Sequence, residues 1–455
     1  MIGFLYIILF LVSIMVLILY IKKGVNVLWI VFFSVFVLYY VFVPTFLNVS
    51  NISEWETVPH STFLDVFFDA TQEDLYRTFL ITLFALITMI IAHWIIKRIK
   101  IIGISKPGSY SNETEENYKY INKVVYYLGV VLLVIGGLAL IEVMVELGGL
   151  KRMLIMGNNI RDYTSNNADF VSPLGAVCMT LSVCVTGSFF CIYSSGEKKK
   201  KHIFLLVVSF IFSVIYLMFN AGRAPLIVFI ACIGLSFFKE RGKSITWIVV
   251  LGVIFILFFS SSLSDVMLNL SRGLFPFHDF SYSFVDNLSA TLTDYSFPYA
   301  NVIELPYMIS KYGYRNGIDY ILWAYELIPK RLLSLSPMTT VTAEVSQYYV
   351  QEGLSIAGTP ADFITFGWFE GNVIGIIANC IVVYCVLNVF YKKLRILPVR
   401  YSAFKYRMCF FAYSLITSND IVLVVKSNLY LIVIMIVIAI AINRSRKNWQ
   451  NEDKD

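Results

Sequence analysis

The sequence has little charge for its length. Only 15% of the 455 residues are Asp, Glu, Lys or Arg, while 58% are hydrophobic. In a soluble domain the charged share is about a quarter. This composition excludes an ordinary soluble enzyme and indicates a chain that lies mostly in a lipid bilayer.

Cysteine is scarce and is never clustered in a polar loop. All seven cysteines lie within apolar segments, so we expect neither a disulfide framework nor a cysteine metal site. Small buried hydrophobic side chains are the expected role. No spacing of acids or histidines requires a metal either, and we expect a protein without metal or cofactor.

Long apolar runs are what the sequence has in abundance. Runs of about 18 to 22 residues recur along it, the length that a helix needs to cross a hydrocarbon core about 30 Å thick. The alternating ten-residue segments of a membrane β-barrel are absent. We predict an all-α polytopic membrane protein with about eleven transmembrane helices, within a range of ten to twelve. The expected spans are residues 2–21, 25–47, 75–96, 124–147, 173–194, 203–220, 223–238, 245–263, 371–390, 404–418 and 421–442.

Alternate connections between these runs are strongly basic. They carry the sequences KKG (22–24), KRIK (97–100), EKKKK (197–201), KERGK (239–243), YKKLR (391–395) and NRSRK (443–447). Because basic loops stay in the cytoplasm, the N-terminus is predicted outside and the C-terminus inside. The net charge of +6 then mostly reports orientation. Between residues 404 and 442, SND (418–420) and Lys426 interrupt the apolar pattern, so the turn between the last two helices could fall on either side of IVLVV.

The connections predicted to be cytoplasmic show no sign of a catalytic or nucleotide-binding site. They contain no P-loop, no dinucleotide glycine pattern and no catalytic motif, and no nucleic-acid-binding motif is visible. No cleavable signal peptide is expected, since no basic region precedes the first apolar run. Any site should therefore face outward.

The outward face carries three sizeable connections, residues 48–74, 148–172 and 264–370. The last has about 107 residues, and a loop of this length without a function would be unusual. It is rich in aromatic residues and holds eleven acids against five cations. We predict that it folds into short helices against the membrane surface and caps a single integral membrane domain, residues 1–455.

Arg223 lies in the sequence NAGRAP (220–225), where two apolar runs meet with almost no loop between them. One interpretation is an interfacial arginine that extends to lipid headgroups. The other is an anion clamp, because a guanidinium matches phosphate oxygens in pairs. A helix that begins at Pro225 would add free N–H donors for an anion.

The large outward loop supplies further cations, and it also holds the carboxylates that could act as a general base. Each of its cations on its own is more often a solvated or interfacial charge; they are Arg272, Lys311, Arg315, Lys330 and Arg331. A base that activates a sugar hydroxyl must lie within hydrogen-bond reach of it. The acids available are Glu304, Glu326, Glu344, Asp362 and Glu370, and the outward histidines are His60 and His278. Taken singly, each is more often a solvated acid, a helix cap or a structural histidine.

At this point the chain resembles the Wzy-type polymerases of O-antigen and capsular repeat units, with the related O-antigen ligases. The resemblance covers the arrangement of spans and one large outward loop along the whole chain. It also covers RAPLIVFIACIG (223–234), an Arg and a Gly with ten residues between them. The third match is GTPADFITFGWFEGNVIG (358–375), where Asp362 stands at a position that is Glu in many members.

The resemblance implies a GT-C-like glycosyltransferase of the bacterial inner membrane that works on the periplasmic face. Such enzymes transfer a growing glycan from undecaprenyl pyrophosphate to a new lipid-linked repeat unit, without metal or nucleotide sugar. Their outward arginines hold the donor pyrophosphate, a role that falls first on Arg223, then on Arg272 and Arg331, and more weakly on Arg161 and Arg315. We expect Asp362 or Glu344 to be the base, and a chain-length regulator is an expected protein partner.

Three other functions stay open at this point. An O-antigen ligase would share the fold and the donor and differ only in its acceptor, lipid A core. A lipid-linked oligosaccharide flippase would need charges along a path through the helices and repeated halves, and the apolar runs here are almost free of charge. A structural or accessory membrane subunit is the third alternative.

Overall fold

The computed structural model is all-helical in the part of the chain that it describes. The described residues are 2–49, 62–99, 115–161, 172–196, 200–219, 223–241, 284–326, 328, 333, 339–353 and 359–452. The expected span 245–263 lies outside them.

The helices of the first half of the chain lie between Ile2 and Glu240. They are α1 (Ile2–Lys22), α2 (Val27–Val37), the π-helical η1 (Leu38–Phe42), α3 (Val43–Val49), α4 (Thr62–Asp69), α5 (Gln72–Ile99), α6 (Glu115–Glu146), α7 (Leu150–Arg161), α8 (Pro173–Ser182), α9 (Cys184–Ser195), α10 (Lys200–Phe219) and α11 (Arg223–Glu240). Helix α2 begins after Asn26, whose side chain accepts a hydrogen bond from the Leu28 N–H at 2.9 Å. Such a cap satisfies one of the free donors at a helix start.

The second half supplies the cap and three further long helices. They are α13 (Phe284–Tyr312), α14 (Ile318–Glu326), α15 (Val341–Gln351), α16 (Phe363–Phe369), α17 (Asn372–Ile396), the short 3-10 helix η5 (Val399–Tyr401), α18 (Ser402–Thr417) and α19 (Ile421–Glu452). The last turn falls at residues 418–420, so IVLVV opens α19 rather than closing α18.

Eight helical stretches among the described residues are long and apolar enough to cross a membrane, by length and composition. They are Ile2–Lys22, Val27–Val49, Gln72–Ile96, Tyr118–Glu146, Pro173–Ser195, Lys200–Phe219, Asn372–Ile396 and Ile421–Ser445. This confirms a polytopic helical membrane protein. The expected segments 223–238 and 404–418 are also helical, as α11 and α18, and these two helices pack on each other. The count of eleven spans stays a prediction.

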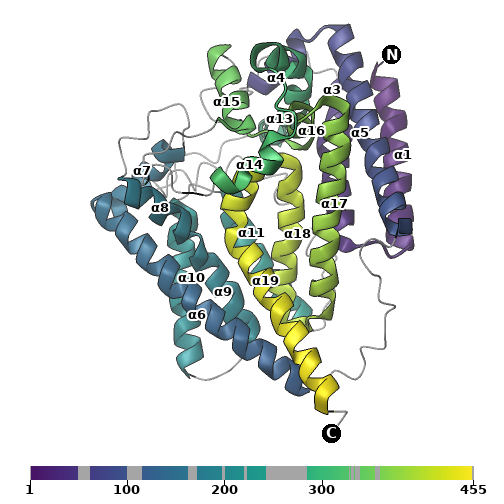
Figure 1. Cartoon of the computed structure of the whole chain (residues 1–455). Coiled ribbons are helices and arrows are strands. Elements are labelled where there is room, and N and C mark those ends of the chain that lie inside the picture. Colours follow the sequence, from purple (N-terminus) through teal and green to yellow (C-terminus); the bar gives the residue numbers. More distant parts are fainter. Residues whose placement is uncertain are drawn as a thin grey trace.

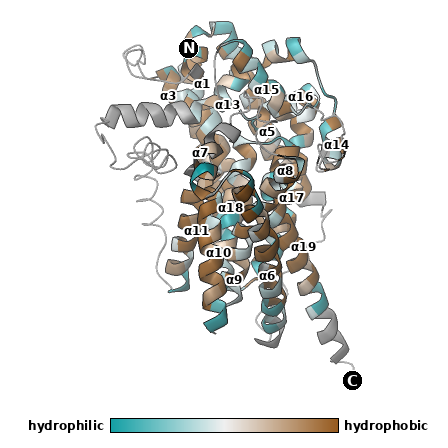
Figure 2. Ribbon diagram, turned by 90° about the vertical axis from the view of Figure 1, so that its left-hand side faces the viewer, coloured by the Kyte–Doolittle hydropathy of each residue, from teal (hydrophilic) through white to brown (hydrophobic). Residues whose placement is uncertain are grey.

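The two termini lie at opposite ends of the molecule. Helix α1 begins at the end where α4, α13, α15 and α16 gather, and α19 runs to the other end (Figure 1). Hydrophobic residues predominate along α6, α10 and α11 below this group (Figure 2). The described helices of the large loop, α13 to α16, thus form a cap over one end of the bundle.

The cap differs from the prediction in one element. Helix α13 has 29 residues, with Pro298 and Pro306 inside it, where short helices were expected throughout. It packs against α4, α5, α15 and α16. Tyr299 of α13 meets Tyr6 of α1 edge to face, with the ring centroids 6.0 Å apart. Long-range aromatic contacts of this kind stabilise a helix that contains proline.

The cap is joined to the bundle by a backbone contact between α16 and α17. A Cβ added at Gly375 would lie 1.9 Å from the carbonyl oxygen of Gly367. No side chain fits at that distance, so glycine at 375 lets α16 fold back on the start of α17. This contact fixes Glu370, which lies between the two helices, beside the rest of the cap.

Candidate functional site

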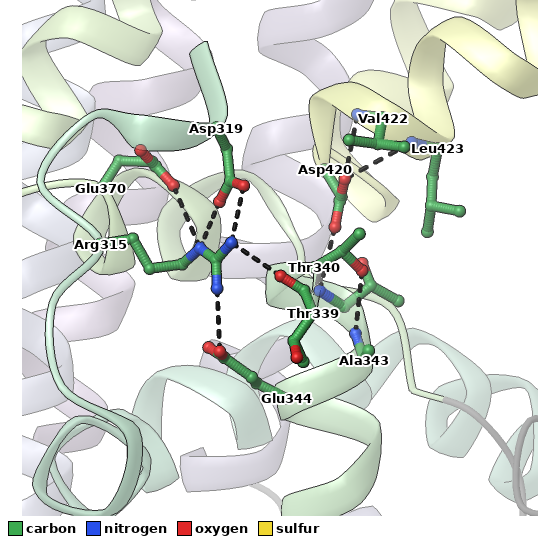
Figure 3. A network of polar contacts seen from close by, with 11 residues as sticks. Arg315, Asp319, Thr339, Thr340, Ala343, Glu344, Glu370, Asp420, Val422 and Leu423 are labelled. Carbon is green, nitrogen blue, oxygen red and sulfur yellow. Dashed lines mark hydrogen bonds and ion pairs between the residues drawn. The ribbon is translucent and has the colours of Figure 1, made fainter. Parts of the chain in front are cut away.

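A group of ion-paired side chains in the cap surrounds Arg315. This arginine lies in the turn between α13 and α14, where Asn316 and Gly317 both have positive φ. Its Nε donates to Asp319 Oδ2 at 2.5 Å and its Nη2 to Asp319 Oδ1 at 2.8 Å. A further bond runs from Nη1 to Glu344 Oε1 at 2.8 Å (Figure 3). The paired contact with Asp319 is the geometry that a planar guanidinium favours.

Three carboxyl groups from three helices meet at this guanidinium. Asp319 lies in the first turn of α14, Glu344 in the first turn of α15, and Glu370 follows the end of α16. Glu370 Oε1 lies 3.9 Å from Arg315 Nε. We call Arg315, Asp319, Glu344 and Glu370 the acidic cluster. Their convergence could not be read from the chain, where they span 56 positions (315 to 370).

The start of α15 is held in place from α19. Asp420 accepts hydrogen bonds from the Val422 N–H and the Thr342 N–H, both at 3.0 Å. Thr340 caps α15, and the adjacent Thr339 carbonyl accepts from Arg315 Nη2 at 2.7 Å (Figure 3). One aspartate therefore joins the first turn of a predicted span to the helix that carries Glu344.

Three carboxyl oxygens in the acidic cluster are buried and accept no hydrogen bond from a described residue. They are Glu344 Oε2 and both Oε atoms of Glu370. Burial, followed by the neighbouring Asp319, raises the pKa of Glu370 from 4.5 to about 9. Burial and the neighbouring carboxylate thus favour the protonated form of Glu370. Unpartnered buried carboxyl oxygens are costly in a fold and are typical of positions that meet a ligand.

Glu370 should make the stability of the protein depend on pH. The folded chain keeps a proton that the unfolded chain releases between pH 4.5 and about 9, so the free energy of unfolding falls as pH rises through this window. Glu370→Gln, a neutral side chain of the same shape, should raise the thermal stability above neutral pH and flatten the pH profile. Thermal unfolding of the purified protein across this window measures both. Parallel profiles for the two proteins would contradict the assignment.

Glu344 is the acid of the cluster best suited to exchange a proton. Burial raises the pKa of Glu344, and this outweighs the opposite effect of Arg315. One of its oxygens is fixed by Arg315 and the other is unpartnered. A carboxylate whose pKa is raised toward neutral pH is an effective general base.

Asp362, the other expected base, accepts hydrogen bonds from other parts of the fold with both of its carboxylate oxygens. It is fully buried and caps α16. Its Oδ1 accepts from Tyr40 Oη and from the Ile364 and Thr365 N–H groups, while Oδ2 accepts from Asn301 Nδ2 at 2.8 Å and from the Thr365 hydroxyl at 2.7 Å. Both oxygens of Asp362 are thus occupied, whereas Glu344 pairs with Arg315 through Oε1 only and keeps Oε2 unpartnered.

The expected phosphate-binding arginines divide into two groups. Arg315 uses four of its five N–H groups on protein acceptors, so it offers little to a phosphate in this arrangement. Arg223 is the first residue of α11 and Arg161 the last of α7, but their side chains lie outside the described part, as do Arg272 and Arg331 altogether.

Asp319 and Asp420 are the functional candidates that sequence reasoning missed. Asp319 follows Arg315 by four residues, but Arg315 lies in the turn before α14, so the contact depends on the conformation of that turn. Asp420 was visible only as an interruption of an apolar run. Among the residues that the structure describes, no group of three or more His, Cys, Asp or Glu could hold a metal ion, and a guanidinium lies among the three acids of the cluster.

Comparisons with protein-family models, with curated proteins and with solved structures find no significant match to this chain.

Proposed function

We propose that this protein is a polymerase of O-antigen or a similar surface polysaccharide. It transfers the growing glycan from undecaprenyl pyrophosphate to a new lipid-linked repeat unit at the end of the bundle covered by the cap. The observation that carries the proposal is the acidic cluster, which offers unpartnered buried carboxyl oxygens at that end. The protein would lie in the bacterial inner membrane with its cap and N-terminus in the periplasm.

The proposed reaction needs one proton acceptor and one anion site. The acceptor hydroxyl oxygen attacks the anomeric carbon of the donor sugar and its proton passes to Glu344 Oε2. The bond from that carbon to the pyrophosphate oxygen breaks, and the pyrophosphate takes the bonding electrons. Arg315 holds Glu344 Oε1 at 2.8 Å and so orients the free oxygen, while Glu370 lies beside the same guanidinium, with its Oε1 3.9 Å from Arg315 Nε.

The leaving pyrophosphate gains negative charge as the bond breaks. Fixed cations stabilise this charge more in the transition state than in the ground state. Arg223 is the first cation we assign here, because it opens α11 and a helix start adds N–H donors and a favourable dipole for an anion. Arg272 and Arg331 are further candidates in the same proposal.

Deletion of the gene tests the function and separates its two closest forms. A polymerase predicts lipid A core that carries a single repeat unit, whereas a ligase predicts core without any repeat. Unchanged long chains would contradict both.

Arg223→Ala, expressed in the deletion strain, should then reduce polymer formation by about 100- to 1,000-fold, as for loss of one oxyanion donor. The matched control is Arg241→Ala, which follows the opposite end of the same helix and contacts Phe237. It should restore full chains, and equal effects of the two variants would remove the phosphate assignment.

A further inference from the structure

A cavity lies at the opposite end of the bundle from the cap. Its volume is about 350 Å³, within the range of small-molecule sites. It is bounded by the start of α2, the ends of α11 and α17, and the first turns of α18. Neither the acidic cluster nor the proposed glycan transfer involves this end.

The wall of the cavity is apolar and its charged residues are all cations. Val27, Leu28, Leu394 and Val399 are among the apolar residues, and Tyr391 and Tyr406 add aromatic surface. The charged lining residues are Lys239, Arg395 and Lys405. Among the residues that the structure describes, no Asp or Glu lines the cavity.

The three cations are not neutralised by neighbouring acids. Lys405 Nζ donates to the Leu397 carbonyl at 2.6 Å and keeps two further donors. Lys239 and Arg395 are exposed. Glu240, next to Lys239, accepts a hydrogen bond from Ser236 at 2.9 Å and does not line the cavity. As far as the described residues line it, the site is thus an apolar hollow with three positive charges and no negative one.

We propose that this cavity binds an anionic phospholipid of the surrounding bilayer. The phosphate headgroup lies among Lys239, Arg395 and Lys405, and part of an acyl chain lies against the apolar wall. Charge complementarity selects an anionic over a zwitterionic lipid, since basic pockets between membrane helices attract anionic headgroups. Interfacial aromatic residues such as Tyr391 and Tyr406 suit the boundary between headgroup and hydrocarbon.

Native mass spectrometry of the full-length protein tests the site, with phosphatidylglycerol and phosphatidylcholine at equal concentrations as probes. Phosphatidylglycerol should be retained in preference. Each of Lys239→Gln, Arg395→Gln and Lys405→Gln should reduce its occupancy by about fivefold. The matched control Lys151→Gln with Arg152→Gln removes two exposed cations on α7 and should leave occupancy unchanged.

A second variant tests the hollow rather than the charge. Val399→Trp, at an exposed lining position, should block the cavity and lower phosphatidylglycerol retention with all three cations intact. Equal retention of the two lipids by the native protein would overturn the proposal, as would undiminished phosphatidylglycerol binding in both Arg395→Gln and Val399→Trp. Either outcome leaves the proposed polymerase activity unaffected, because the two sites share no residue.

Discussion

Glu344→Gln is expected to lower glycan transfer by about 100- to 10,000-fold, the usual contribution of a general base. Glutamine keeps the shape of the side chain and can still accept from Arg315 Nη1 through its carbonyl oxygen. It has no basic oxygen to take the proton of the acceptor hydroxyl. Transfer by the purified variant, with a lipid-linked repeat unit as donor and acceptor, measures the loss per folded molecule.

Two acids serve as controls for this experiment. Glu352 ends the same helix, is half-exposed and pairs with Lys311 at 2.9 Å, so Glu352→Gln should transfer glycan at the native rate. Asp362→Asn keeps one acceptor oxygen for the cap of α16 but loses bonds made by the other. It should lower the yield of folded protein while leaving the rate per folded molecule near the native value. If Asp362→Asn greatly lowers the rate per folded molecule while Glu344→Gln transfers glycan at the native rate, the base is Asp362 and not Glu344.

Arg315→Met is expected to destabilise the fold by about 3–5 kcal/mol, because loss of one partner leaves buried charges uncompensated. The Arg315 side chain is 12% exposed and contacts two carboxyl groups directly. Without it, Asp319, Glu344 and Glu370 would face one another with no cation between them. The start of α15, bonded to Arg315 through the Thr339 carbonyl, would lose part of its support.

Unfolding of the purified protein by heat or denaturant measures this effect. Arg315→Lys should recover only part of the stability, because an ammonium group cannot make the paired contact with Asp319. Lys311→Met is the matched control. Its salt bridge with Glu352 is about 36% and 46% exposed on the two sides, and such pairs contribute about 1 kcal/mol or less. Native-like stability of Arg315→Met would mean that the cluster does not hold the cap together.

The spans were readable from the sequence because a bilayer imposes a simple length rule on apolar runs. The expected segment 371–390 corresponds to α17 and 173–194 to α8 with α9. The ends of the spans were harder to place, because polar residues are tolerated near the membrane interface and the apolar runs have no sharp limits there. Asp420 shows why: it interrupts an apolar run and also caps the helix that follows, and only its bonds to Val422 and Leu423 reveal the second role.

The candidate site was only partly readable. The sequence offered Glu344 and Asp362 as alternative bases and Arg315 as a weaker phosphate ligand, each as a single residue of the large loop, and these roles stay predictions. Whether Asp362 or Arg315 has a free polar group depends on hydrogen-bond partners from other parts of the chain. Tyr40 and Asn301 occupy Asp362, while Asp319 and Glu344 occupy Arg315, and no spacing along the chain encodes such contacts.

The sequence by itself determined that the chain is a multi-pass helical membrane protein, because burial of apolar length in a bilayer depends on composition over about twenty neighbouring residues. The tertiary structure decided which acids of the large loop meet and which of them keep an unpartnered oxygen. The physical reason is that the pKa and the hydrogen bonds of Glu370 and Glu344 arise from burial against α14 to α16, which exists only once those helices have packed.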